Sequence, residues 1–279
     1  MQGRPILIAQ ISDLHIKCPG VRAYGKVDTA AALARCVETL NRFSPRPDFV
    51  VISGDLVDTP AKEEYDHLLA LLAPLKIPFA AIPGNHDDRA LMRAALPGQP
   101  YATSAGALNL SCTAGNLDIV LLDSSVPGAP HGELDAGTLA WLDAVLATST
   151  SRTALVTLHH PPFITGIDHM DVQNLRNASE FASVLRRHQR VRLVSAGHVH
   201  RAVLTVFAGI PATICPAPNH AVALDLNKQF PPSFKIEPPG FHLHACFPND
   251  EWGDVVTHLV PIGTFDGPHP FFGPDGRHL

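Results

Sequence analysis

Short, nearly continuous apolar runs that end in polar residues dominate the first two thirds of the sequence. They occupy residues 6–11, 49–53, 79–82, 117–122, 154–158 and 192–196. Runs of this kind are typical of strands that are covered on both faces, as in parallel sheets flanked by helices. Helical patterns separate them at residues 28–41, 60–73, 135–147 and 179–187. The first part of the chain is therefore expected to form an α/β fold.

The pattern changes after about residue 200. Further strand-like runs at residues 202–207, 210–214, 221–226, 241–247 and 255–260 follow one another with no helical pattern between them. Pro231-Pro232 and Pro238-Pro239 mark a stiff, extended loop, and the tail from Gly263 is rich in glycine, proline and aromatic residues. We therefore expect the last part of the chain to be β-rich, with the tail lying on a surface.

Composition excludes several classes of function. The net charge of −5 and the lack of a basic block argue against binding to a nucleic acid polymer. No apolar stretch approaches the roughly 20 residues that a membrane helix needs, and residues 5–11 are interpreted as a strand rather than a signal peptide. The five cysteines are scattered, which favours a reducing compartment. We expect a cytoplasmic protein without membrane contact.

The polar residues at the strand ends carry the chemistry. They form the segments Asp13-Leu14-His15, Gly54-Asp55-Leu56-Val57-Asp58, Gly84-Asn85-His86-Asp87, His159-His160 and Gly197-His198-Val199-His200. The carboxyl ends of the strands in an α/β sheet gather along one edge, where ligand sites usually form. Asp-x-His or Gly-Asp alone is more often surface polarity or a turn than a site, and His-x-His alone is an even bet. Five in order, with carboxylate and imidazole donors, predict a centre for Mn, Fe, Zn or Co.

This set of motifs (D-x-H, G-D-x-x-D, G-N-H-D, H and G-H-x-H) resembles the calcineurin-like metallophosphoesterase superfamily over residues 13–200. The segments at residues 83–88 and 238–244 resemble bacterial class III cyclic nucleotide phosphodiesterases and glycerophosphodiesterases. The resemblance implies a four-layer α/β/β/α sandwich with a dinuclear site at one edge. It places the catalytic core at residues 1–215. Residues 216–279 would supply late strands that complete the sandwich, a small cap or dimerisation region and the tail.

The resemblance also assigns roles to residues. One divalent ion would be held by Asp13, His15, Asp55 and His200, and the other by Asp55, Asn85, His159 and His198, with Asp55 as the bridge. Mn²⁺, Fe²⁺ or Zn²⁺ are expected, with Co²⁺ as an alternative, and a hydroxide between the ions would attack the phosphorus. His86 is predicted to assist the leaving oxygen and Asp58 to orient His86. Substrate contacts are expected from Asn85, His86 and His200.

Departures from related families narrow the function. Purple acid phosphatases carry a tyrosine where this chain has Asp58, and serine/threonine protein phosphatases carry Arg-Gly where it has Thr59-Pro60. The leading interpretation is hydrolysis of a small phosphodiester, either a 3′,5′-cyclic nucleotide or a glycerophosphodiester. A phosphomonoesterase and a noncatalytic scaffold are the alternatives. A homodimer or higher homo-oligomer is expected from the resemblance.

Histidines outside the motifs are given lesser roles. His160 is interpreted as shaping the loop before two prolines. His242 and His244 alternate along a predicted strand and are interpreted as a polar strand face. Asn219 and His220, after a proline-rich turn, are candidates for reaching the site.

Overall fold

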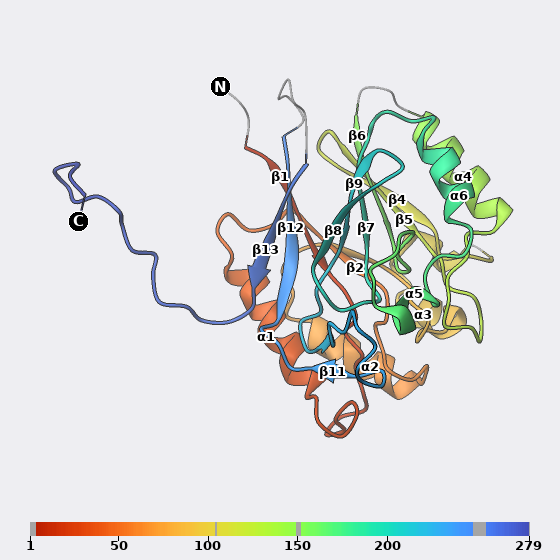
Figure 1. Cartoon of the computed structure of the whole chain (residues 1–279), viewed down its shortest axis with the longest axis horizontal. Helices are drawn as coiled ribbons and strands as arrows, with labels where there is room; N and C mark the ends of the chain where they lie inside the picture. Colours follow the sequence, from red (N-terminus) through yellow and green to blue (C-terminus); the bar gives the residue numbers. More distant parts are fainter. Residues whose placement is uncertain (1–3, 104, 149–151, 248–254, 279) are drawn as a thin grey trace.

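Two β-sheets pack face to face and carry helices on their outer sides (Figure 1). The structure is a computed structural model that describes residues 4–103, 105–148, 152–247 and 255–278. The inner faces share one apolar core, in which Ile8 and Val51 of the first sheet cluster with Ile119 and Leu155 of the second. The core therefore holds the two sheets together.

The first sheet has the strand order β13-β12-β1-β2-β3. β1 (Ile6–Ile11), β2 (Phe49–Ser53) and β3 (Phe79–Ile82) run parallel, so their carboxyl ends lie at one edge. β12 (Gly240–Cys246) pairs antiparallel with β1, and β13 (Val255–Pro261) pairs antiparallel with β12. The late strands therefore extend the sheet that the first strands begin.

The second sheet has the order β4-β5-β6-β7-β9-β8. Its parallel centre consists of β5 (Leu117–Leu122), β6 (Thr153–Leu158), β7 (Val191–Ala196) and β9 (Ile210–Ile214). β4 (Leu110–Ala114) and β8 (Val203–Phe207) are antiparallel edge strands. A separate two-stranded sheet joins β10 (Ala221–Val222) to β11 (Phe234–Lys235).

Helices form the two outer layers. α1 (Thr29–Arg42), α2 (Lys62–Leu72) and α3 (Arg89–Ala95) pack with the first sheet, while α4 (Ala136–Ala147) and α6 (Ala178–Leu185) pack on the second. A short α5 (Asp168–Asp171) and a 3₁₀ helix (Pro100–Thr103) lie in connections. The side chain of Asp28 accepts a hydrogen bond from the Ala31 N–H and so caps α1. The expected four-layer α/β/β/α sandwich is confirmed.

Some elements differ from those that the sequence predicts. α2 begins at Lys62 rather than at residue 60, and the run at residues 221–226 forms only the two residues of β10. The sequence pattern does not indicate α3 and β4, because both are short and carry little periodicity. The boundary at residue 215 stays a prediction. No helix in the described ranges is long and apolar enough to cross a membrane.

His242 and His244 share one face of β12, as their alternation predicts, but that face is buried. Both are 1% exposed on β12. His244 forms hydrogen bonds through Nε2 to Gln10 Oε1 at 3.1 Å and through Nδ1 to Thr257 Oγ1 at 2.9 Å. These partners allow a polar imidazole to be buried.

After β13 the tail runs away from the two sheets (Figure 1).

Candidate metal centre

The two sheets bring their strand ends together at one place. Asp13, Asp55 and Asn85 follow β1, β2 and β3 of the first sheet, whereas His159, His198 and His200 follow β6 and β7 of the second. His15 lies two residues beyond Asp13. All seven predicted ligands therefore lie where the parallel strands of the two sheets end.

Asp55 lies at the centre of this cluster. Its Oδ2 atom is 3.5 Å from His15 Nε2 and 3.4 Å from His159 Nε2. On one side, His200 Nε2 lies 3.4 Å from Asp13 Oδ1 and 3.2 Å from His15 Nε2. On the other side, His159 Nε2 lies 3.3 Å from Asn85 Oδ1. Asp55 thus lies between donors from both sheets, and one ligand atom each from Asp13, Asp55 and His159 also lies within 4.8 Å of the others.

The backbone is unusual at most of these positions. Asp13, His15, Asp55, His198 and His200 have φ values of 56°, 46°, 49°, 73° and 56°. Such left-handed conformations are uncommon outside glycine and persist where the surrounding structure enforces them. Backbone hydrogen bonds from Asp13 N to Gly54 O and from His15 N to Asp55 O, both 3.0 Å long, link two of these loops.

Close packing holds the loops against one another. A Cβ atom on Gly84 would lie 2.1 Å from Asp55 Oδ1 and 2.5 Å from the Asp55 backbone N. A Cβ atom on Gly197 would lie 3.0 Å from Asp13 Oδ2. Only glycine permits these approaches. The glycines before Asn85 and His198 therefore let the loops reach the cluster.

The donors fit divalent cations. His198 Nε2 is buried and has no hydrogen-bond partner among the described residues. His15 Nε2 and His200 Nε2 face each other, and at most one of these two nitrogens can carry a hydrogen when both rings are neutral. At least one of them therefore presents a lone pair. Buried nitrogen lone pairs beside two carboxylates are the donors that Mn, Fe, Co and Zn accept.

The ionisation of the cluster supports the same interpretation. Burial, together with the charge of Asp55, raises the pKa of Asp13 to about 6, although His159 and His15 act in the opposite direction. Burial also acts to raise the pKa of Asp55, but His159, His86 and His15 hold it well below its usual value. Without metal, the carboxylate at the centre is therefore already charged.

The imidazoles divide into two kinds. Burial acts to lower the pKa of His159, but the neighbouring carboxylates of Asp55 and Asp13 raise it to about 9. Burial, with neighbouring imidazoles, lowers the pKa of His198 and His200 well below the usual value. His198 and His200 are therefore neutral and have lone pairs for a cation, whereas His159 must lose a proton to bind one.

Asp58 and His86 lie beside the cluster, and Asp58 contacts His86 through its backbone carbonyl rather than through its carboxylate. His86 Nδ1 donates to the backbone carbonyl of Asp58 at 2.8 Å. The Asp58 carboxylate instead contacts His15 Nδ1 at 3.2 Å and Lys17 Nζ at 3.0 Å. Burial acts to raise the pKa of Asp58, but the hydrogen bonds from His15 and Lys17 lower it to about 2. Asp58 thus fixes the ring of a predicted ligand.

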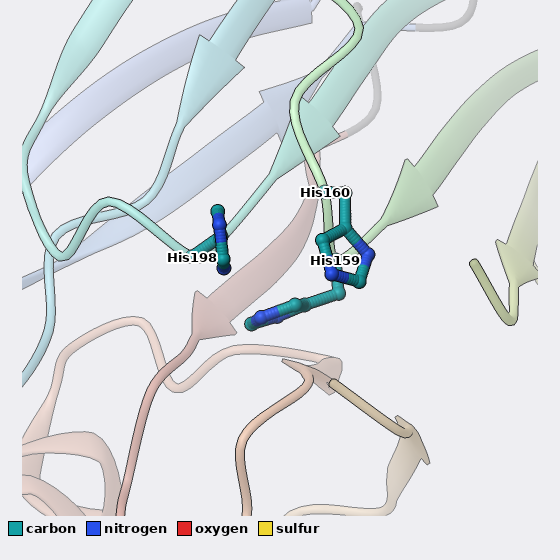
Figure 2. A group of neighbouring side chains, drawn as sticks. All are labelled: His159, His160 and His198. Carbon is teal, nitrogen blue, oxygen red and sulfur yellow. The ribbon is translucent and has the colours of Figure 1, made fainter. Parts of the chain in front are cut away.

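Figure 2 shows His159, His160 and His198 converging from the ends of β6 and β7. His159 Nδ1 donates to Ser53 O at 2.8 Å, which directs Nε2 towards Asp55. His160 Nδ1 contacts Ser124 Oγ at 2.8 Å. One ligand atom from each of the three histidines lies within 4.8 Å of the others. His160 therefore lies beside two predicted ligands, and its role in shaping the loop stays a prediction.

Sequence reasoning gave no role to Asp87. Its carboxylate accepts hydrogen bonds from the backbone N–H groups of Gly84 and Leu56, at 2.9 and 3.0 Å, and from Tyr65 Oη at 3.0 Å. Burial, with the charge of Asp55, raises the pKa of Asp87 to about 6 despite these donors. Asp87 ties the loop after β3 to the loop after β2. In the sequence, the position of Asp87 at the end of the Gly-Asn-His-Asp segment is the one feature that could have indicated this role.

A cavity of about 380 Å³ opens onto the cluster. Asp55, Asn85, His86 and three other histidines of the cluster line one part of it. Asn219 and His220 do reach this region. Asn219 Nδ2 donates to the Asp13 carbonyl at 2.9 Å, and the His220 ring centre lies 4.5 Å from that of His200.

Comparison with known families decides the relationship. The calcineurin-like phosphoesterase family matches residues 6–202, which contain every predicted ligand. The chain belongs to the calcineurin-like phosphoesterase family. This confirms the resemblance drawn from the motifs, and the overlapping groups of histidines and aspartates that could hold a cation agree with a family that depends on two metal ions.

Relatives within the calcineurin-like phosphoesterase family cover most of the chain. A probable glycerophosphodiester phosphodiesterase of Arcobacter nitrofigilis is 37% identical over 98% of this chain and 99% of its own length. A cAMP/cGMP dual specificity phosphodiesterase of Mycobacterium tuberculosis is 37% identical over 76% of this chain and 67% of its own length. A dimetal phosphatase from Danio rerio has a similar fold, with a TM-score of 0.61 and 17% identity over 94% of this chain and 100% of that one.

Proposed function

We propose that this chain is a dinuclear-metal-dependent phosphodiesterase that hydrolyses a small phosphodiester, either a 3′,5′-cyclic nucleotide or a glycerophosphodiester. The observation that carries the proposal is the position of Asp55, which lines a cavity and whose Oδ2 atom lies within 3.5 Å of both His15 and His159. The names of the relatives support a diester substrate.

The proposed ligand sets are those that the family resemblance assigns. Asp13, His15, Asp55 and His200 would hold one ion, and Asp55, Asn85, His159 and His198 the other. Mn²⁺, Fe²⁺ and Zn²⁺ suit these nitrogen and oxygen donors, and Co²⁺ is an alternative. When bound, two such ions neutralise charge on the phosphate and supply a water-derived nucleophile at neutral pH.

The residues around the ions would position the substrate and move a proton. Since a backbone carbonyl only accepts, His86 Nδ1 carries the hydrogen in its bond to Asp58 O. The other nitrogen, Nε2, is then the one that can donate to the leaving oxygen when the ring is protonated. Asn85, His86 and His200 line the cavity and are proposed to contact the phosphate.

We also propose a cytoplasmic homodimer or higher homo-oligomer. All five cysteines are free, which suits a reducing compartment. The edge strands carry exposed apolar side chains, with Leu204 and Val206 of β8 being 73% and 66% exposed and Leu259 of β13 being 56% exposed. Unpaired apolar edges of this kind favour pairing with another chain.

The test compares bis- and mono-p-nitrophenyl phosphate with the Mn²⁺-loaded protein, and then cyclic AMP and glycerophosphocholine. Hydrolysis of the diester is expected, and hydrolysis of the monoester alone would reject the proposal in favour of a phosphomonoesterase. His86→Ala should retain both ions while turnover falls by about 10²–10⁴-fold. His258→Ala, an exposed histidine on β13, is the matched control.

A further inference from the structure

Part of the cavity wall is aromatic rather than polar. Tyr24, His220 and Phe234 line the same cavity as the predicted ligands but come from separate segments of the chain. Their rings are in mutual contact, with centres 5.4 Å apart for Tyr24 and His220, 5.3 Å for His220 and Phe234, and 5.1 Å for Tyr24 and Phe234. We name Tyr24 and Phe234 the aromatic wall.

His220 connects the aromatic wall to the cluster. Its ring centre lies 4.5 Å from that of His200 and 5.9 Å from that of His15. His220 therefore lies between the aromatic wall and a phosphate held at the cluster. Tyr24 has φ 52° and is 53% exposed, so its loop holds a large ring at the cavity rim in an uncommon backbone conformation.

The arrangement favours a flat ligand over a compact cation. The Tyr24 and Phe234 rings are inclined by 34° with centres 5.1 Å apart, which is direct contact and leaves no space for a group between them. A ligand must lie across them. Asp55 is the one carboxylate among the described residues that line the cavity, and it belongs to the cluster. A quaternary ammonium group is bound by the faces of several rings that surround it, and two rings in direct contact form no such cage.

We propose that the aromatic wall of Tyr24 and Phe234 stacks the base of a nucleotide whose phosphate is held at the cluster. The inference rests on the proposed function and selects the cyclic nucleotide from its two substrate classes. Every base has an aromatic face, and stacking on an aromatic side chain is worth about 5- to 150-fold in binding. A glycerol group has no such face and would leave both rings in water.

The test measures binding of 5′-AMP and ribose 5-phosphate to the Zn²⁺-loaded protein by titration calorimetry. These two probes share the phosphate and ribose and differ in the base. Wild type should bind 5′-AMP at least about tenfold more tightly, and Phe234→Ala should remove most of this preference. Phe234→Tyr should retain it. Phe230→Ala is the matched control, because Phe230 lies four residues before Phe234, is 68% exposed and does not line the cavity.

Equal affinities for the two probes in wild type would overturn the inference. A preference for 5′-AMP that survives both Tyr24→Ala and Phe234→Ala would also overturn it, as would an equal loss in Phe230→Ala. If Phe234→Ala weakened glycerophosphocholine binding but not 5′-AMP binding, the aromatic wall would be a cation site instead. Hydrolysis of bis-p-nitrophenyl phosphate is measured separately, so failure of the proposed function is distinguished from failure of base stacking.

Discussion

Replacing Gly84 by alanine should disable the site without unfolding the protein. The added Cβ atom would lie 2.1 Å from Asp55 Oδ1 and 2.5 Å from the Asp55 backbone N. The side-chain oxygen can rotate away, but the backbone N cannot do so without moving its loop. The backbone N must retreat from 2.5 Å to about 3.4 Å, where ordinary contact begins.

The size of the effect follows from this displacement. Overpacking of a close contact costs about 1–3 kcal/mol of stability. In a chain of this size each kcal/mol lowers Tm by about 2–4 °C. A shift approaching 1 Å at a catalytic group costs about 10²-fold in rate. Gly84→Ala should therefore lower kcat/KM by about 10²-fold while Tm falls by about 2–12 °C.

Three measurements check the prediction: hydrolysis of bis-p-nitrophenyl phosphate, metal content after reconstitution, and scanning calorimetry. Gly98→Ala is the control, since a Cβ atom there meets nothing within 4 Å. It should be neutral or stabilise by up to about 1 kcal/mol. A Gly84→Ala variant with wild-type kcat/KM and full metal content would refute the reasoning, because the position of Asp55 would then not depend on the close approach.

Two further predictions concern protons and hydrogen bonds. Metal binding should release protons and tighten as pH rises from about 5 to 9. The reason is that the pKa of Asp13 is raised to about 6 and that of His159 to about 9, and both groups must be unprotonated to bind a cation. Calorimetry in buffers of different ionisation enthalpy measures the proton release, and a metal affinity independent of pH would contradict the prediction. Tyr65→Phe should cost about 1–3 kcal/mol of stability, because its hydroxyl donates to the buried Asp87 carboxylate at 3.0 Å. An unchanged denaturation midpoint would show that this bond contributes nothing.

The strand ends make the site predictable from sequence. A buried parallel strand is a short apolar run, and its carboxyl end lies beside those of its neighbours, so the sequence alone places Asp13, Asp55 and Asn85 together. The roles of these residues as ligands stay predictions. The left-handed backbone conformations of Asp13 and Asp55 could not be predicted, because such conformations depend on the loops packed around them.

Contacts between distant segments escape sequence analysis. The alternation of His242 and His244 correctly indicates a shared face, but only the partners Gln10 and Thr257 decide that His244 can be buried there. The aromatic wall joins segments about 210 positions apart in the sequence, and neither segment has a periodicity from which to infer a contact. Whether the side chain or the backbone carbonyl of Asp58 contacts His86 is likewise a matter of geometry.

The supply of ligands by both sheets links metal binding to the relative position of the sheets. Asp13 and Asp55 move with the first sheet, and His159 and His198 with the second. If ions bind as proposed, a change in the core that alters the spacing of the sheets changes metal affinity, and metal binding must favour the original spacing by the same free energy. The apolar core far from the cavity would then tune the affinity of the centre, and metal affinity would report on how the core is packed.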